Sequence, residues 1–236
     1  MIMGESLMEK IISSTDGSHI FYKILGHGSP IFFIHGNSGS HHAFQKQVDA
    51  FQKDHQLILM DTRDHGKSTN ESNQLDFSAI FSDILTILDN EQIEKVMMVG
   101  FSDGANIALS FANYYPERIS KMVLISPNIR FDQLKKSKQL LYRSLYAISD
   151  QFLRLKKESR VLRLAMKNLP LTKNYRETLK MPILFIFGDR DIIDLNKMTP
   201  FVDSLKQAKM VIFNKTGHSI LRTRPLLVNK EINSFI

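Results

Sequence analysis

Short runs of four or five apolar residues recur along the chain, and each ends at a turn-forming or polar residue. The runs are Ile31–Ile34, Leu57–Met60, Val96–Val99, Met122–Ile125, Ile183–Phe187 and Met210–Phe213. Apolar runs of this length without polar alternation are typical of strands that are buried on both faces. They predict a central, mostly parallel sheet.

Helical patterns lie between these runs. Ala105–Ala112 follows a glycine turn, and Ala79–Leu88 places four apolar side chains on one helix face, namely Ile80, Ile84, Ile87 and Leu88. Alternation of strands and helices predicts a doubly wound α/β architecture. The first two apolar stretches, Ile11–Ile12 and His19–Leu25, are separated by turn residues and predict an antiparallel hairpin.

One stretch departs from this alternation. No strand-like run occurs between about Ile129 and Lys180, where Leu140–Leu145 and Val161–Met166 have helical spacing. About fifty helical residues exceed a normal crossover between strands. We therefore expect an α/β core formed by residues 1–126 and 181–236, with residues 127–180 inserted as a helical cap.

The composition narrows the possible classes of protein. The chain has 236 residues, 43% apolar and 23% charged, which suits one globular domain of the larger kind. The absence of Cys excludes a disulfide framework, a thiolate metal site, an iron–sulfur cluster and a Cys nucleophile. The segment Met1–Lys10 lacks the pattern of a secretory signal, and no apolar run is long enough to span a membrane. We expect a cytoplasmic protein.

The motif with the clearest chemical meaning is Gly100-Phe101-Ser102-Asp103-Gly104, a G-x-S-x-G sequence between a strand run and a helix. A serine on a tight strand-to-helix turn projects its hydroxyl above the sheet edge, and the flanking glycines permit close backbone contacts. The backbone N–H of Asp103 would then lie at a helix N-terminus, where it can stabilise an oxyanion. The alternative is a glycine-rich turn without chemistry.

A serine nucleophile needs a base, and the base needs an orienting acid. His218 follows the last strand run, and Asp189 and Asp191 follow the run Ile183–Phe187. The order Ser, Asp, His along the chain is the one that this architecture imposes. The histidines show no metal-binding spacing such as H-E-x-x-H, so we expect no metal site.

Four motifs in order make the chain resemble the α/β-hydrolase superfamily over nearly its whole length. They are Phe33-Ile34-His35-Gly36-Asn37-Ser38-Gly39, Asp61-Thr62-Arg63-Asp64-His65-Gly66-Lys67-Ser68, the G-x-S-x-G sequence, and the pair Gly188-Asp189-Arg190-Asp191 with Gly217-His218. The resemblance implies the α/β-hydrolase fold and a reaction that needs no cofactor.

The resemblance also implies roles for single residues. Ser102 corresponds to the nucleophile, His218 to the general base and Asp191 to the acid, with Asp189 and then Asp194 as less favoured acids. The oxyanion hole would consist of the backbone N–H groups of Asn37 and Asp103. Some relatives carry the acid after the preceding strand, where this chain has Ser126-Pro127-Asn128 and no carboxylate. Asp64 stands where the superfamily commonly has Gly, which puts the geometry of that turn in doubt.

The side chain at position 102 determines which kind of carbon atom the nucleophile can attack. Displacement at saturated carbon needs a carboxylate nucleophile, whereas a serine alkoxide attacks carbonyl carbon and forms an acyl-enzyme. Hydrolysis of a small carboxylic ester is the leading function. Cleavage of a C–C bond, thioester or amide and acyl transfer are alternatives on the same triad, and a non-catalytic ligand-binding protein on this scaffold is another. Asp103 could contact a cationic substrate group, or it could be favoured only by the helix dipole.

The net charge of +7 is unevenly distributed. Residues 127–180 hold 14 Lys+Arg against 4 Asp+Glu, a charge of +10, and the remainder has a charge of −3. The basic residues could form a solvated outer face, or they could steer anionic substrates or touch an anionic surface. We expect a small acyl substrate, no nucleic-acid partner, no stable membrane insertion, and a monomer or homodimer. The sequence does not identify substrate-binding residues.

Overall fold

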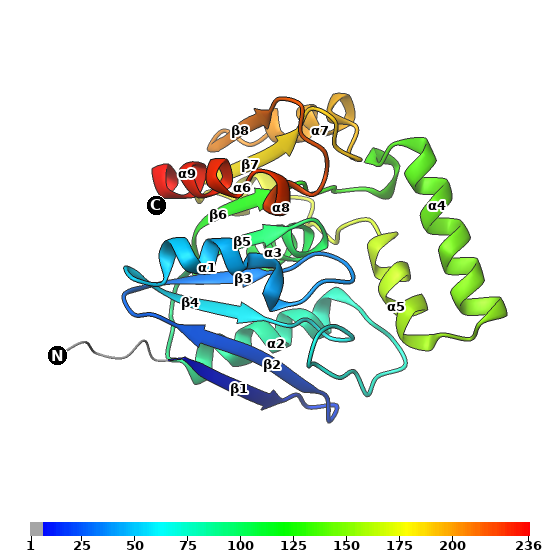
Figure 1. Cartoon of the computed structure of the whole chain (residues 1–236), viewed down its shortest axis with the longest axis horizontal. Coiled ribbons are helices and arrows are strands. Elements are labelled where there is room, and N and C mark those ends of the chain that lie inside the picture. Colours follow the sequence, from blue (N-terminus) through cyan, green and yellow to red (C-terminus); the bar gives the residue numbers. More distant parts are fainter. Residues whose placement is uncertain (1–6) are drawn as a thin grey trace.

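The computed structural model describes residues 7–236, so most of the Met1–Lys10 segment lies outside the described residues. Within them, eight strands form one sheet in the order β1-β2-β4-β3-β5-β6-β7-β8 (Figure 1). The strands are β1 (Met8–Ser13), β2 (His19–Leu25), β3 (Ser29–Ile34), β4 (His55–Met60), β5 (Val96–Phe101), β6 (Ile119–Ile125), β7 (Ile183–Gly188) and β8 (Ala208–Phe213).

Helices connect most of the strands. They are α1 (Gln45–Phe51), α2 (Phe77–Asn90), α3 (Asp103–Tyr114), α4 (Lys136–Ala147), α5 (Lys156–Ala165), α6 (Tyr175–Thr178), α7 (Leu195–Asp203), α8 (Ile220–Thr223) and α9 (Pro225–Phe235). Short 3₁₀ turns η1 (His41–Phe44), η2 (Pro116–Arg118) and η3 (Phe131–Gln133) and a π turn η4 (Ile148–Phe152) complete the set.

The sheet is buried because helices cover both of its faces. Strands β3 to β8 run parallel, whereas β2 pairs antiparallel with both β1 and β4. Side chains alternate along each strand, so Phe32 packs in the cluster that holds α2, α3 and α7, and Phe33 packs in the cluster that holds α1, α8 and α9. Burial on both faces explains why the strands read as unbroken apolar runs.

The predicted elements are largely confirmed. All six apolar runs lie within strands, the N-terminal hairpin is antiparallel, and α2 and α3 contain the two predicted helices. The four apolar residues predicted on one face of α2 are all buried. The expectation of burial on both faces is wrong for Met210–Phe213, because β8 is the edge strand and Ile212 is exposed.

Residues 127–180, here called the helical segment, contain α4, α5 and α6 between β6 and β7. The helical spacing predicted for Leu140–Leu145 and Val161–Met166 is thus confirmed. Helices α4 and α5 stand beyond the carboxyl ends of the parallel strands, and α4 projects farthest from the sheet (Figure 1). The division of the chain into two domains stays a prediction. In the described part of the chain no helix is long and apolar enough to cross a membrane.

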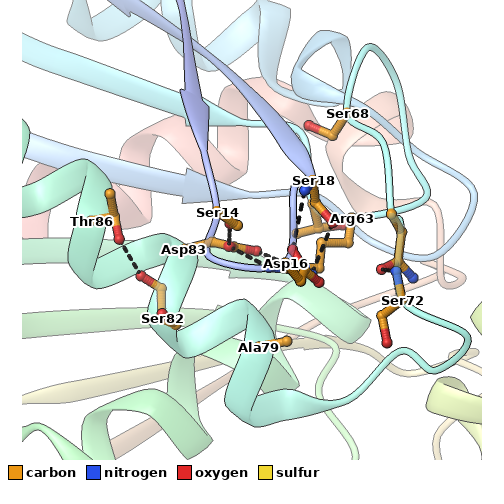
Figure 2. Close-up of polar contacts among 12 residues, drawn as sticks. Ser14, Asp16, Ser18, Arg63, Ser68, Ser72, Ala79, Ser82, Asp83 and Thr86 are labelled. Carbon is orange, nitrogen blue, oxygen red and sulfur yellow. Dashed lines mark hydrogen bonds and ion pairs between the residues drawn. The ribbon is translucent and has the colours of Figure 1, made fainter.

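Arg63, in the second motif, ties the N-terminal hairpin to α2. Its guanidinium donates to both oxygens of Asp83, at 2.6 and 2.9 Å, and to Asp16 and Ser18 in the hairpin turn (Figure 2). Arg63 and Asp83 are both buried, so the pair is shielded from solvent. The motif therefore has a structural function in this part of the fold.

Candidate active site

The G-x-S-x-G sequence forms the predicted strand–turn–helix junction. Strand β5 ends at Phe101, α3 begins at Asp103, and Ser102 between them has a φ of 53°, in the left-handed region. A Cβ on Gly104 would lie 2.0 Å from the carbonyl oxygen of Ile34, and one on Gly100 would lie 2.5 Å from the Cα of Ala105. No side chain fits at either glycine, which explains why the turn needs both of them.

The structure brings Ser102, His218 and Asp191 into contact. His218 Nε2 lies 3.0 Å from Ser102 Oγ, and His218 Nδ1 lies 2.7 Å from Asp191 Oδ1. Each residue follows the carboxyl end of a strand, β5, β7 or β8, and parallel strands place these ends at one edge of the sheet. In such an arrangement the imidazole can take the proton of the serine hydroxyl, and the carboxylate can stabilise the resulting imidazolium.

The two alternative acids lie elsewhere. The Asp189 carboxylate accepts the backbone N–H of Thr216 at 2.9 Å, and Asp194 caps the N-terminus of α7. Of these three carboxylates, Asp191 alone contacts His218 among the described residues.

Ser126 also belongs to this site, although sequence reasoning missed it. It is buried at the end of β6, and its hydroxyl donates to Asp191 Oδ2 at 2.5 Å. Burial opposes ionisation of Asp191, but hydrogen bonds from His218 and Ser126 outweigh it and hold the pKa of this carboxyl below its usual value. The sequence marks this position only by its lack of a carboxylate, but a hydroxyl there can donate to an acid on the next strand.

Asn37, one of the predicted oxyanion residues, follows a glycine that lies against the nucleophile. A Cβ on Gly36 would be 3.0 Å from Ser102 Cβ, and the Asn37 side-chain amide donates to Asp103 Oδ2 at 3.1 Å. Among residues 7–236 the backbone N–H groups of Asn37 and Asp103 have no hydrogen-bond partner. Their role as donors to an oxyanion stays a prediction.

Asp103 is half-buried. Burial raises the pKa of its carboxyl above the usual value, against the hydrogen bond from Asn37. Its second oxygen accepts from Asn106 at 3.4 Å. Two protein amides therefore already contact the carboxylate that the sequence suggested for a cationic substrate group, and that role stays a prediction.

His35 connects the loop that contains Gly36 and Asn37 to the loop after β4. Its Nδ1–H donates to the carbonyl oxygen of Gly36 at 2.8 Å, while Nε2 accepts the backbone N–H of Thr62 at 3.2 Å. Complete burial lowers its pKa to about 4, so the ring is neutral at physiological pH. A neutral imidazole with one donor and one acceptor fits this position.

The helical segment contacts the same loops through two neighbouring residues of α5. The Asn37 amide donates to the Val161 carbonyl oxygen at 3.3 Å, and Arg160 donates to both carboxylate oxygens of Asp64 at 2.6 and 2.8 Å. Asp64 has a φ of 63°, so it adopts the left-handed conformation that glycine commonly supplies, and the turn is kept. The sequence shows only that Asp64 replaces the usual Gly of the superfamily. The basic excess of residues 127–180 is the one sequence feature that indicates a cationic partner such as Arg160.

The comparisons with known proteins agree with this fold. The chain belongs to the alpha/beta hydrolase fold family, whose pattern matches residues 29–166. It is 24% identical to the AB hydrolase superfamily protein YisY of Bacillus subtilis, over 97% of this chain and 99% of that protein. It is also 24% identical to the pimeloyl-[acyl-carrier protein] methyl ester esterase of Wigglesworthia glossinidia brevipalpis, over 92% and 97% of the two chains.

A solved structure shows the same likeness. Naproxen esterase from Bacillus subtilis is similar with a TM-score of 0.80 and 18% identity, covering 98% of this chain and 92% of that one. The family, the fold and the esterase-like relatives define this protein as an α/β hydrolase.

Proposed function

We propose that this chain is a serine hydrolase that cleaves a small carboxylic ester through an acyl-enzyme. The observation that carries the proposal is the hydrogen-bonded chain from Asp191 through His218 to Ser102, at a turn where Ser102 has a left-handed backbone. The esterase among the relatives that align along nearly the whole chain supports an ester as the substrate.

In this mechanism Ser102 Oγ attacks the ester carbonyl carbon while His218 Nε2 takes the hydroxyl proton. The backbone N–H groups of Asn37 and Asp103 stabilise the oxyanion of the tetrahedral intermediate. His218 then returns the proton to the leaving alcohol as the C–O bond breaks. Water attacks the acyl-enzyme with His218 again as base, which releases the carboxylic acid and restores Ser102. No step needs a cofactor or a metal.

We also propose that the helical segment, residues 127–180, is a cap domain over the core formed by residues 1–126 and 181–236. Its support is the pair of contacts from α5 to Asn37 and Asp64, which join the segment to the loops around Ser102. A cytoplasmic location and a monomeric or homodimeric state remain predictions from the sequence.

The test combines active-site labelling with turnover. A fluorophosphonate probe should label the wild type, and Ser102→Ala should abolish labelling and lower kcat/KM for a short-chain p-nitrophenyl ester by about 10³-fold or more. Ser219→Ala is the matched control, because this exposed serine is next to His218 and its hydroxyl makes no hydrogen bond within residues 7–236. Labelling that survives in Ser102→Ala would overturn the proposed nucleophile.

A substrate panel separates the alternatives that share this chemistry. Esters, thioesters, amides, diketones for C–C cleavage and alcohol acceptors for acyl transfer should be compared in the wild type and in Ser102→Ala. Ester turnover faster than every other reaction is the expected result. Tight, saturable ligand binding without turnover of any compound would instead favour the non-catalytic alternative.

A further inference from the structure

The outer end of the helical segment carries a concentrated group of exposed apolar side chains. Of the fifteen large apolar residues that are exposed in residues 7–236, seven fall between positions 140 and 155. Phe152 is 77% exposed and Leu153 is 59% exposed. Single exposed apolar residues are normal on a protein surface, but a cluster of this kind marks an interaction site.

The geometry of α4 and η4 joins these side chains into one surface. No residue of α4 is buried. The spacing of seven and four positions places Leu141, Ile148 and Phe152 on one side of the helix and its continuation into η4. Leu145 lies between them in the sequence and lines a hollow with Ser38 and Asp64. Leu153 and Leu155 follow in the turn toward α5. We call residues 141–157 the apolar tip.

The apolar tip also contains basic residues. Arg143, Arg154, Lys156 and Lys157 are exposed, and none of them forms an ion pair in the part of the chain that the structure describes. Within residues 141–157, Asp150 is the one acid. An apolar stripe between unpaired cations is typical of a helix that lies in the interface of an anionic membrane.

We propose that the apolar tip docks this protein onto anionic phospholipid bilayers. Phe152 and its neighbours would enter the boundary between head groups and acyl chains, and Arg154, Lys156 and Lys157 would contact lipid phosphates. A second copy of the chain is a poor occupant, because docking two tips brings together two segments that each carry a charge of +10. Attachment of this kind lies on the surface and needs no spanning helix, and it does not depend on the reaction proposed above.

Co-sedimentation with vesicles tests the proposal. The full chain should bind vesicles of equimolar phosphatidylglycerol and phosphatidylcholine at low salt, and its partition coefficient should fall about tenfold or more in about 0.5 M NaCl. Phe152→Ser/Leu153→Ser should weaken binding by about tenfold or more. The matched control is Leu226→Ser/Leu227→Ser, which removes another adjacent exposed pair, on α9, and should bind like the wild type.

A second pair of variants tests the contribution of the basic residues to binding. Arg154→Gln/Lys156→Gln/Lys157→Gln should lose binding to the anionic vesicles, whereas Lys53→Gln/Lys95→Gln/Lys206→Gln makes the same change of charge at exposed positions outside the helical segment and should keep it. Equal weakening in both triple variants, or equal binding to pure phosphatidylcholine, would overturn the proposal.

The absence of Trp allows a direct test of insertion. Phe152→Trp creates a protein with a single Trp, and its emission should shift to shorter wavelength with anionic vesicles, while Leu226→Trp should show no shift. No shift in Phe152→Trp, or no sedimentation with either vesicle, would refute docking. A dimer in sedimentation velocity that Phe152→Ser/Leu153→Ser dissociates would identify a second copy as the occupant and would also overturn the proposal.

Discussion

Removal of the Arg160 guanidinium should loosen the helical segment from the core. Arg160 on α5 binds both oxygens of Asp64, and the side chains of the two residues are only 16% and 4% exposed. In Arg160→Gln the Asp64 carboxylate remains buried and, within residues 7–236, keeps only the hydrogen bond from Asn70, at 2.9 Å. A buried charge that loses its partner destabilises a fold more than the intact pair stabilised it.

The magnitude follows from the burial of the pair. Exposed ion pairs contribute about 0–1 kcal/mol, whereas breaking a fully buried pair costs about 3–5 kcal/mol. Arg160 keeps some contact with solvent and Asp64 keeps one donor, so we expect a loss of about 2–3 kcal/mol in the free energy of unfolding. For a chain of this size the melting temperature should fall by about 5–10 °C.

Three measurements show where Arg160→Gln destabilises the protein. Thermal unfolding gives the total loss, and hydrogen exchange should show protection of the α5 amides falling by about 30- to 150-fold if the segment opens locally. Steady-state kinetics should show a lower kcat with a smaller change in KM, because Val161 beside Arg160 accepts the amide of Asn37. Arg163→Gln is the control, since Arg163 is exposed on the same helix.

The double variant provides the sharpest test. Asp64→Asn/Arg160→Gln removes the unpaired buried charge and should recover part of the stability that Arg160→Gln loses. A melting temperature for Arg160→Gln equal to that of Arg163→Gln, or a double variant no more stable than Arg160→Gln, would refute the reasoning.

Two further predictions concern pH. Asp191 titrates below its usual value of 3.8 in the fold, so its ionised form stabilises the protein above that pH and the contribution is lost as pH falls through the folded value. Ser126→Ala removes one of the bonds responsible, so acid unfolding should begin at a higher pH than in the wild type, and kcat/KM at neutral pH should fall about tenfold. Asp103 has the opposite shift: its pKa is raised, so the wild type loses stability as pH rises from 3.8 through the folded value. Asp103→Asn does not titrate, and its melting temperature relative to the wild type should increase between acid and neutral pH; a constant difference would contradict this.

The fold was largely predictable because a strand that is buried on both faces must be apolar along its whole length. Strands of the central sheet cannot alternate with polar residues, so each appears as an apolar run between turn residues. Strand β8 shows the limit of this inference. Its run is as apolar as the others, but its place at the edge depends on how the whole sheet is assembled, which no local pattern records.

The candidate site was predictable where an element end fixes the residue. Ser102, Asp191 and His218 each follow a strand, so one architecture places all three. Three contacts were not predicted, because no motif or element end marks them: Ser126 with Asp191, Asn37 with Val161, and Arg160 with Asp64, which are 65, 124 and 96 positions apart. Such long-range pairings depend on tertiary packing, and composition alone indicated only that cations gather in residues 127–180.

The strand order also determines when the proposed machinery is complete. From β5 onward the strands lie side by side in chain order, so during synthesis each new strand adds at one edge of the sheet. Ser102 arrives with β5 and Asp191 follows β7, but His218 comes only after the last strand. A nascent chain, or one cut before β8, therefore presents the serine hydroxyl without its base. The fold itself would delay the proposed reactivity until the sheet has been finished.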